Sequence, residues 1–162
     1  SALEEEYLVY HFELSTSGGN TSEGTEVTFD PSKIVFGDIE SNGNLRIEIY
    51  NEYGSTKANP PLSTALTFGK KLEVTFTLGG VTLKSGAAGT YDASIYFADS
   101  DWNPQGNGAV TKVGGNGTYT VKFEPTTASD GVMVFVVDIK GLLKDVTDIS
   151  SVTATVNKIV IK

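Results

Sequence analysis

Hydrophobic and polar residues alternate along most of this chain, and a period of two predicts β-strands rather than helices. In Leu72 to Leu78, for example, every second side chain is apolar and those between are polar. Clusters of Gly, Asn, Asp and Pro separate such segments, as is typical of turns. The pattern predicts strands over residues 7–14, 26–29, 34–36, 45–53, 71–78, 90–98, 119–123, 131–139, 152–156 and 158–161.

Local departures from simple alternation carry further information. The run from Gly131 to Ile139 is apolar almost without a break, which predicts a central strand buried on both faces. Asn42-Gly43 predicts a tight hairpin turn between the strands on either side of it. Alternation breaks near Asn157, which predicts a β-bulge, and Gly141 to Asp148 fits a short helical turn.

These elements predict the fold class. About nine to eleven short strands without a fixed-period repeat indicate an all-β, antiparallel two-sheet β-sandwich. A jelly roll is the preferred topology, and an immunoglobulin-type sandwich is the alternative. The length of 162 residues fits one domain that spans residues 1–162.

Charge and composition narrow the range of partners. Twelve Lys and Arg against 20 Asp and Glu give a formal charge of −8, which repels nucleic acid. No apolar run is long enough to cross a membrane, and the absence of Cys removes disulfides and thiolate chemistry. The beginning, SALEEEYLVY, contains no signal peptide pattern, and we expect a module of a longer secreted, extracellular protein.

The segment that is the main candidate for ligand binding is TYDASIYFADSDWNPQGNG, which contains the only tryptophan of the chain. Alternation places Tyr96 on the face opposite the core, and the same parity leads into the loop toward Trp102. Gln105 and Asp101 lie nearby and can hydrogen-bond hydroxyl groups. An aromatic pair flanked by amides and carboxylates suits a sugar ring. Equally, Trp102 can cap the loop and Tyr96 can fill a second layer.

Two further tyrosines extend the candidate surface. In the strand 45–53, Tyr50 follows the same parity as Arg46 and Glu48, so we expect it on the polar face. Tyr53 stands where a proline-containing loop begins. Both are candidates for an aromatic platform, and both can instead be packing residues.

Five stretches of the chain share their strand order and loop character with a known family: VTFDPSKIVFGDIESNGNLRIEIYNEYG, KKLEVTFTLGG, YDASIYFADSDW, TYTVKFE and GVMVFVVDIKGLL. Together they resemble the jelly-roll carbohydrate-binding modules attached to bacterial plant-cell-wall glycanases. The chain is most similar to modules of cellulosomal and rumen bacteria, such as families 11 and 65. The resemblance covers most of the chain through strand order and loop character rather than through a signature motif.

The resemblance implies non-catalytic binding of plant cell-wall β-glucan, such as xyloglucan, mixed-linkage glucan or cellulose chains, and a covalently linked catalytic domain. It implies a binding face built from Tyr50, Tyr53, Tyr96 and Trp102, with Gln105 and Asp101 as hydrogen-bonding groups. Such modules often present several tryptophans, whereas this chain has one. Many also hold a structural calcium, for which residues 4–6, 13 and 138 are possible carboxylate ligands, although no EF-hand-like spacing is present.

Two other function classes remain open. A small glycoside hydrolase needs two carboxylates about 5–9 Å apart. Glu48 and Glu52 would stand about 13 Å apart on an extended strand, and Asp99 and Asp101 lie among solvated groups, so catalysis is not expected. A structural or docking module, in which the same tyrosines fill space between sheets, is the second alternative.

Overall fold

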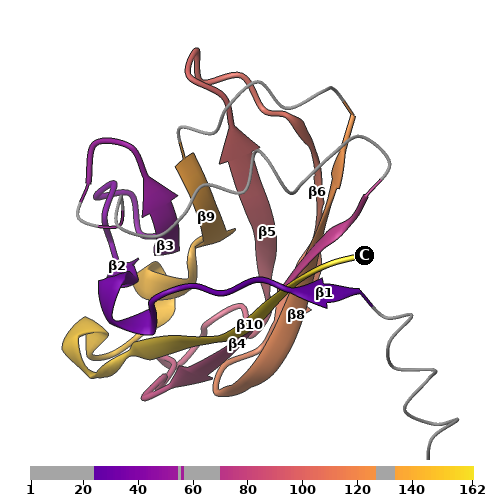
Figure 1. Ribbon diagram of the computed structural model, residues 1–162. Coiled ribbons are helices and arrows are strands. Elements are labelled where there is room, and N and C mark those ends of the chain that lie inside the picture. Colours follow the sequence, from indigo (N-terminus) through magenta and orange to yellow (C-terminus); the bar gives the residue numbers. More distant parts are fainter. Residues whose placement is uncertain (1–23, 55, 57–69, 127–133) are drawn as a thin grey trace, which may run out of the picture.

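The computed structural model describes residues 24–54, 56, 70–126 and 134–162, and it consists of two antiparallel five-stranded sheets packed face to face (Figure 1). The all-β sandwich expected from the alternation is therefore confirmed. The strand expected over residues 7–14 lies outside the described residues. Within the described part, no helix is long and apolar enough to cross a membrane.

Each sheet is assembled from strands that are distant in sequence. The first sheet has the order β1-β10-β4-β8-β6, and the second sheet has the order β2-β3-β9-β5-β7. In the first sheet these strands are Thr25–Glu26, Thr153–Ile161, Leu72–Gly79, Gly117–Pro125 and Gly106–Ala109. In the second sheet they are Val35–Gly37, Leu45–Asn51, Val134–Ile139, Tyr91–Ala98 and Thr111–Val113.

The chain passes back and forth between the sheets, which is the jelly-roll arrangement expected from the sequence. It goes from β3 to β4, from β4 to β5, from β7 to β8, from β8 to β9 and from β9 to β10, changing sheets each time. The short strands β6 and β7 are separated by Val110 alone, and they pair with different sheets. The immunoglobulin-type order is not observed.

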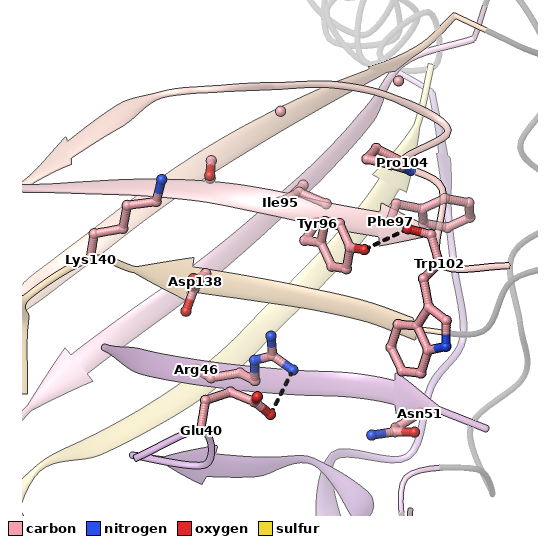
Figure 2. A pocket seen from close by; sticks show the side chains of 13 residues that line it. Glu40, Arg46, Asn51, Ile95, Tyr96, Phe97, Trp102, Pro104, Asp138 and Lys140 are labelled. Carbon is pink, nitrogen blue, oxygen red and sulfur yellow. Dashed lines mark hydrogen bonds and ion pairs between the residues drawn. The ribbon is translucent and has the colours of Figure 1, made fainter. Parts of the chain in front are cut away.

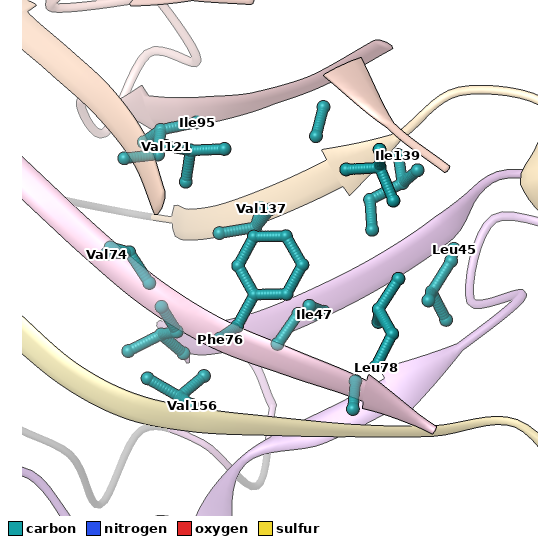
Figure 3. Close-up of a cluster of buried hydrophobic side chains, with 14 of the residues drawn as sticks. Leu45, Ile47, Val74, Phe76, Leu78, Ile95, Val121, Val137, Ile139 and Val156 are labelled. Atoms are coloured by element: carbon teal, nitrogen blue, oxygen red, sulfur yellow. The ribbon is translucent and has the colours of Figure 1, made fainter. Parts of the chain in front are cut away.

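The core fills the space between the sheets with the inward-facing half of each alternating strand (Figure 3). Phe76 of β4, Ile47 of β3 and Val137 of β9 are fully buried there. Strand β9 lies between β3 and β5, and its outward-facing Val134 and Val136 are also buried. The central position expected for the apolar run is therefore confirmed.

Two β-bulges change which side chains face the core. The register between β10 and β4 shifts between Val156 and Lys158, which confirms the expected bulge near Asn157. A second shift, in β3 between Glu48 and Tyr50, was not expected from the sequence. Short 3₁₀-helices complete the fold at Pro31–Lys33, Leu142–Asp145 and Ile149–Ser151, and the second of these is the expected helical turn.

Candidate binding groove

A groove of about 620 Å³ lies on the outer face of the second sheet (Figure 2). Its floor comes from β3, β9 and β5, and the loop after β5 forms one wall. In Figure 2, Trp102 and Asn51 lie at one end of the groove and Lys140 lies at the other. The lining residues are Glu40, Arg46, Asn51, Ser94, Ile95, Tyr96, Phe97, Trp102, Pro104, Gly106, Gly108, Asp138 and Lys140.

Strand register explains why these side chains meet. Arg46 pairs with Asp138, and Asp138 pairs with Ser94, so the three residues form one row across β3, β9 and β5. Tyr96 lies two residues beyond Ser94 on β5 and pairs with Val136. It packs on a small outer cluster formed by Val136, Ala98 and Val134. Outward-facing side chains of one row point the same way, so the floor places a polar row next to the ring of Tyr96.

The polar row is rich in charge. The Arg46 guanidinium Nη1 lies 3.5 Å from Oε2 of Glu40, while its buried Nε has no hydrogen-bond partner. Asn44 Nδ2 donates to Oδ2 of Asp138 at 3.5 Å. Burial raises the pKa of Asp138, and the positive charges of Arg46 and Lys140 partly oppose this rise. A guanidinium group and a half-buried carboxylate thus line the groove in the same row.

The aromatic end of the groove is formed by the loop after β5. The Trp102 side chain is 51% exposed, and its backbone has a φ of +66°, in the left-handed region that most residues avoid. Tyr96 Oη donates to the carbonyl oxygen of Trp102 at 3.0 Å, so floor and rim are directly connected. The expected juxtaposition of Tyr96 and Trp102 is observed, and both line the groove.

The remaining expected site residues do not line the groove. Tyr53 is 77% exposed and Asp101 is exposed, but neither contributes to the lining. Gln105 is only 5% exposed, and its side-chain nitrogen donates to Asp99 and to the backbone of Asn103. The amide of Gln105 is therefore used inside the loop, and its expected role as a sugar-binding group stays a prediction.

The expected outward position of Tyr50 is wrong. The bulge after Glu48 inserts one residue, so Tyr50 pairs with Phe135 and joins the core with 4% of its surface exposed. Its hydroxyl donates to Oε2 of Glu52 at 2.6 Å. Burial, together with this carboxylate, raises the pKa of Tyr50 to about 12.

The sequence interpretation missed the charged row of the groove. Arg46 was noted only as an outward-facing residue, and Asp138 only as a possible calcium ligand. The available signal was the single carboxylate of Asp138 within an otherwise apolar strand. A charge retained at such a position indicates a polar environment on one face of a buried strand.

The acids that the sequence suggested as metal ligands or as a hydrolytic pair can be followed only where they lie within the described residues. The described residues contain no group of three or more metal-ligating side chains, and residues 4–6 and 13 lie outside them. Glu48 is buried and accepts hydrogen bonds from Asn51 and Thr56, whereas Glu52 accepts one from Tyr50. These two carboxylates therefore serve the local structure of β3.

Comparisons with known proteins place few constraints on this chain. No family model matches it, and no curated protein matches it, so membership of families 11 or 65 stays a prediction. One similar solved structure is the CBM22-1 xylan-binding domain from Paenibacillus barcinonensis Xyn10C. That domain is 13% identical, with 83% of each chain covered, and the TM-score of 0.32 is too low to support an inference about function.

Proposed function

We propose that this protein is a non-catalytic carbohydrate-binding module that holds a polysaccharide chain in the groove of the second sheet. The observation that carries this proposal is the half-exposed indole of Trp102, placed beside Tyr96 at the end of a groove whose floor is polar. An exposed indole at the rim of a groove offers a flat apolar face to a ligand rather than to the core.

The chemistry of the groove matches that of a sugar chain. The C–H face of a pyranose ring packs on an aromatic ring, while its hydroxyl groups both donate and accept hydrogen bonds. Arg46 lines the groove with a guanidinium group that can donate hydrogen bonds, and Asp138 supplies an acceptor in the same row. A hydroxyl group can satisfy both, which a purely apolar ligand cannot do.

The proposed ligand class is β-glucan of plant cell walls, including xyloglucan, mixed-linkage glucan and cellulose chains. This choice rests on the family resemblance, which also suggests that the module directs a linked glycoside hydrolase to its substrate in a secreted protein. An open groove buries only part of its ligand, so we expect dissociation constants on the order of micromolar to sub-millimolar.

Isothermal titration with xyloglucan, mixed-linkage glucan and cellohexaose tests the proposal, with Trp102→Ala and Tyr96→Ala measured beside the parent protein. Tyr53→Ala is the matched control, because it removes an exposed aromatic side chain that does not line the groove. We expect at least tenfold weaker binding for Trp102→Ala and unchanged binding for the control.

The outcomes separate the function from its location. Binding that survives both groove variants but is lost in Tyr53→Ala would move the site to another surface. Failure to bind any of the three glucans would reject the β-glucan ligand, and failure across a wider glycan array would favour a docking module instead. Release of reducing ends from a glucan by the purified protein would contradict the non-catalytic role.

A further inference from the structure

The loop that carries Trp102 is more extensively hydrogen-bonded than a simple surface connection. We propose that Asp99 and Gln105 are positioning residues, which fix the indole of Trp102 at the groove before a glycan arrives. The expected effect on glycan affinity rests on the proposed function. The order of the loop in the absence of a ligand can be tested independently.

The backbone at Trp102 requires external support. A φ of +66° is disfavoured for a residue with a large side chain, because the Cβ atom crowds the backbone. Such a conformation persists where the surrounding structure holds it in place. Both polar groups of the Trp102 backbone are hydrogen-bonded, the N–H to the carbonyl oxygen of Asp99 at 3.0 Å and the C=O to Tyr96 Oη at 3.0 Å.

Asp99 closes the loop through its backbone and both carboxylate oxygens. Its N–H donates to the carbonyl oxygen of Asn103 at 3.1 Å. Its Oδ1 accepts from the backbone N–H groups of Asp101 and Asn103, each at 2.9 Å, and its Oδ2 accepts from Gln105 Nε2 at 3.0 Å. One aspartate therefore binds the residues immediately before and after Trp102 as well as the end of the loop.

Gln105 connects this loop to both sheets. Its backbone N–H donates to the carbonyl oxygen of Phe97 in β5 at 2.9 Å, and its own carbonyl oxygen accepts from Thr126, just after β8, at 3.0 Å. The side-chain Nε2 donates to Asp99 and also to the carbonyl oxygen of Asn103, both at 3.0 Å. Through these hydrogen bonds, Gln105 attaches the loop at the rim of the groove to strands of both sheets.

Asp99 remains an acceptor over a wide pH range. The backbone hydrogen bond from Asn103 is the main cause that lowers the pKa of Asp99, and the bond from Asp101 adds to it. Neither Asp99 nor Gln105 lines the groove, so neither is placed to contact the ligand directly. Their effect on binding must act through the position of Trp102, whose side chain would otherwise have to become ordered when the ligand binds.

The test compares Asp99→Ala with Asp148→Ala, an aspartate that closes a similar turn far along the chain. Asp148 accepts from Ser150 N–H at 3.1 Å and from the hydroxyl groups of Ser150 and Ser151, and none of these residues lines the groove. Because the chain has one tryptophan, steady-state fluorescence anisotropy and quenching by acrylamide report on Trp102 alone.

In the absence of glycan, Asp99→Ala should lower the anisotropy of Trp102 and increase its quenching, while Asp148→Ala should leave both unchanged. In titrations with the best-binding glucan, Asp99→Ala should weaken binding about five- to tenfold, since ordering the loop must then occur on binding. Urea unfolding of both variants checks that global stability does not account for the difference.

Three further variants keep the test decisive if Asp99→Ala folds poorly. Tyr96→Phe keeps the ring but removes the hydroxyl bond to Trp102, so it should loosen the indole to a smaller degree. Asp99→Asn retains Oδ1 but places a donor against Gln105 Nε2, and adding Gln105→Glu supplies an acceptor there. The double variant should therefore recover part of the anisotropy that Asp99→Asn loses.

Distinct results overturn the two proposals. Unchanged anisotropy and affinity in Asp99→Ala, with binding lost in Trp102→Ala, would reject the positioning role and leave the proposed function intact. Equal loss of affinity in Asp99→Ala and Asp148→Ala would also reject it, since general destabilisation would then explain both. Unchanged affinity in Trp102→Ala would reject the groove as the binding site, while the ligand-free fluorescence would still test the positioning role.

Discussion

The outer faces of the two sheets follow the same alternating pattern. They differ in which polar groups have hydrogen-bond partners and in which aromatic side chains are exposed. On the second sheet, the Nε of Arg46 has no partner and the indole of Trp102 is half exposed. On the first sheet, Thr75 and Thr120 bond each other through their hydroxyl groups at 3.0 Å, and Thr118 and Thr77 do so at 2.8 Å.

The outer face of the first sheet is called the threonine face here, after Thr75, Thr77, Thr118 and Thr120. The hydroxyl groups of these residues hydrogen-bond one another. Thr77 donates its single hydroxyl proton to Oδ1 of Asn157 at 2.9 Å, so Thr118 must donate to Thr77. The described outward positions of β4, β8 and β10 carry no aromatic side chain. The difference between the faces shows that one alternating pattern can leave an indole and a charged row exposed on one sheet and mutually bonded hydroxyl groups on the other.

The sharpest way to break this comparison is to remove the guanidinium group of Arg46 from the groove. Arg46→Ala should weaken glucan binding about ten- to a hundredfold, because a hydrogen bond from a charged group contributes about 1.5–3 kcal/mol. Lys122→Ala, which removes a cation from the outer face of the first sheet, is the matched control and should have no effect. Isothermal titration measures both, and equal losses would mean that the effect arises from net charge alone.

A smaller effect is expected at Tyr50, which lies on the inner side of the second sheet. Tyr50→Phe removes the bond to Glu52 and should lower the free energy of unfolding by about 1–2 kcal/mol without changing glucan affinity. Reduced binding with unchanged stability would place Tyr50 in the site after all, contrary to its burial.

Tyr50 also predicts a pH dependence. Its pKa is raised from 10.0 to about 12, mainly by burial, so its neutral form is favoured in the folded state. The contribution of this shift to the free energy of unfolding is fully present below pH 10.0, and it is lost as the pH rises through about 12. Urea unfolding across this range should show a smaller alkaline loss for Tyr50→Phe than for the parent protein.

A more modest effect concerns Asp138 on the groove floor. Because burial raises its pKa above 3.8, the folded chain binds more protons than the unfolded chain just above that pH, and this residue's contribution to stability falls as the pH rises through that window. Asp138→Asn mimics the neutral acid and should be more stable than the parent protein at neutral pH. Arg46, Lys140 and Glu40 face the same group, and their charges remain.

The difference in unfolding midpoint between Asp138→Asn and the parent protein, measured at neutral and weakly acidic pH, isolates this effect. The difference should shrink as the pH falls. A constant difference would contradict the pKa shift. Such a comparison is needed because Asp99, Asp145 and Asp148 have lowered pKa values and change the total stability in the opposite direction.

The smallest effect is expected on the threonine face. Replacing both Thr75 and Thr120 with Val removes a donor and its acceptor together, so the free energy of unfolding should change by less than about 1 kcal/mol. Glucan binding should be unchanged in the same titrations. Weakened binding would show that the first sheet also contributes to recognition, and the contrast between the faces would fail.

The extent to which the sequence predicts this structure depends on whether a feature is visible in local alternation. The bulge near Asn157 was predicted because the apolar positions visibly change parity there. The bulge before Tyr50 was not, since an isoleucine and a tyrosine are both compatible with either face. One inserted residue moved Tyr50 from the expected binding surface into the core.

The groove was predicted only where its residues are neighbours in sequence. Tyr96 and Trp102 were placed together because only five residues lie between them on one strand and its loop. Arg46 and Asp138 are brought together by the pairing of β3 with β9, and local patterns carry no information about that pairing. Gln105 was correctly expected near Trp102. Its burial inside the loop was not expected, because that burial depends on contacts with both sheets.

The central position of β9 has a consequence for the timescale on which the groove keeps its shape. Its backbone is paired on both sides, by β3 and β5, and five of its six side chains are buried. Amide protons in such a strand exchange with solvent only through the largest opening motions, whereas short edge strands such as β2 and β7 open more readily. Hydrogen exchange should therefore find the slowest amides of the second sheet directly beneath the groove, in β9.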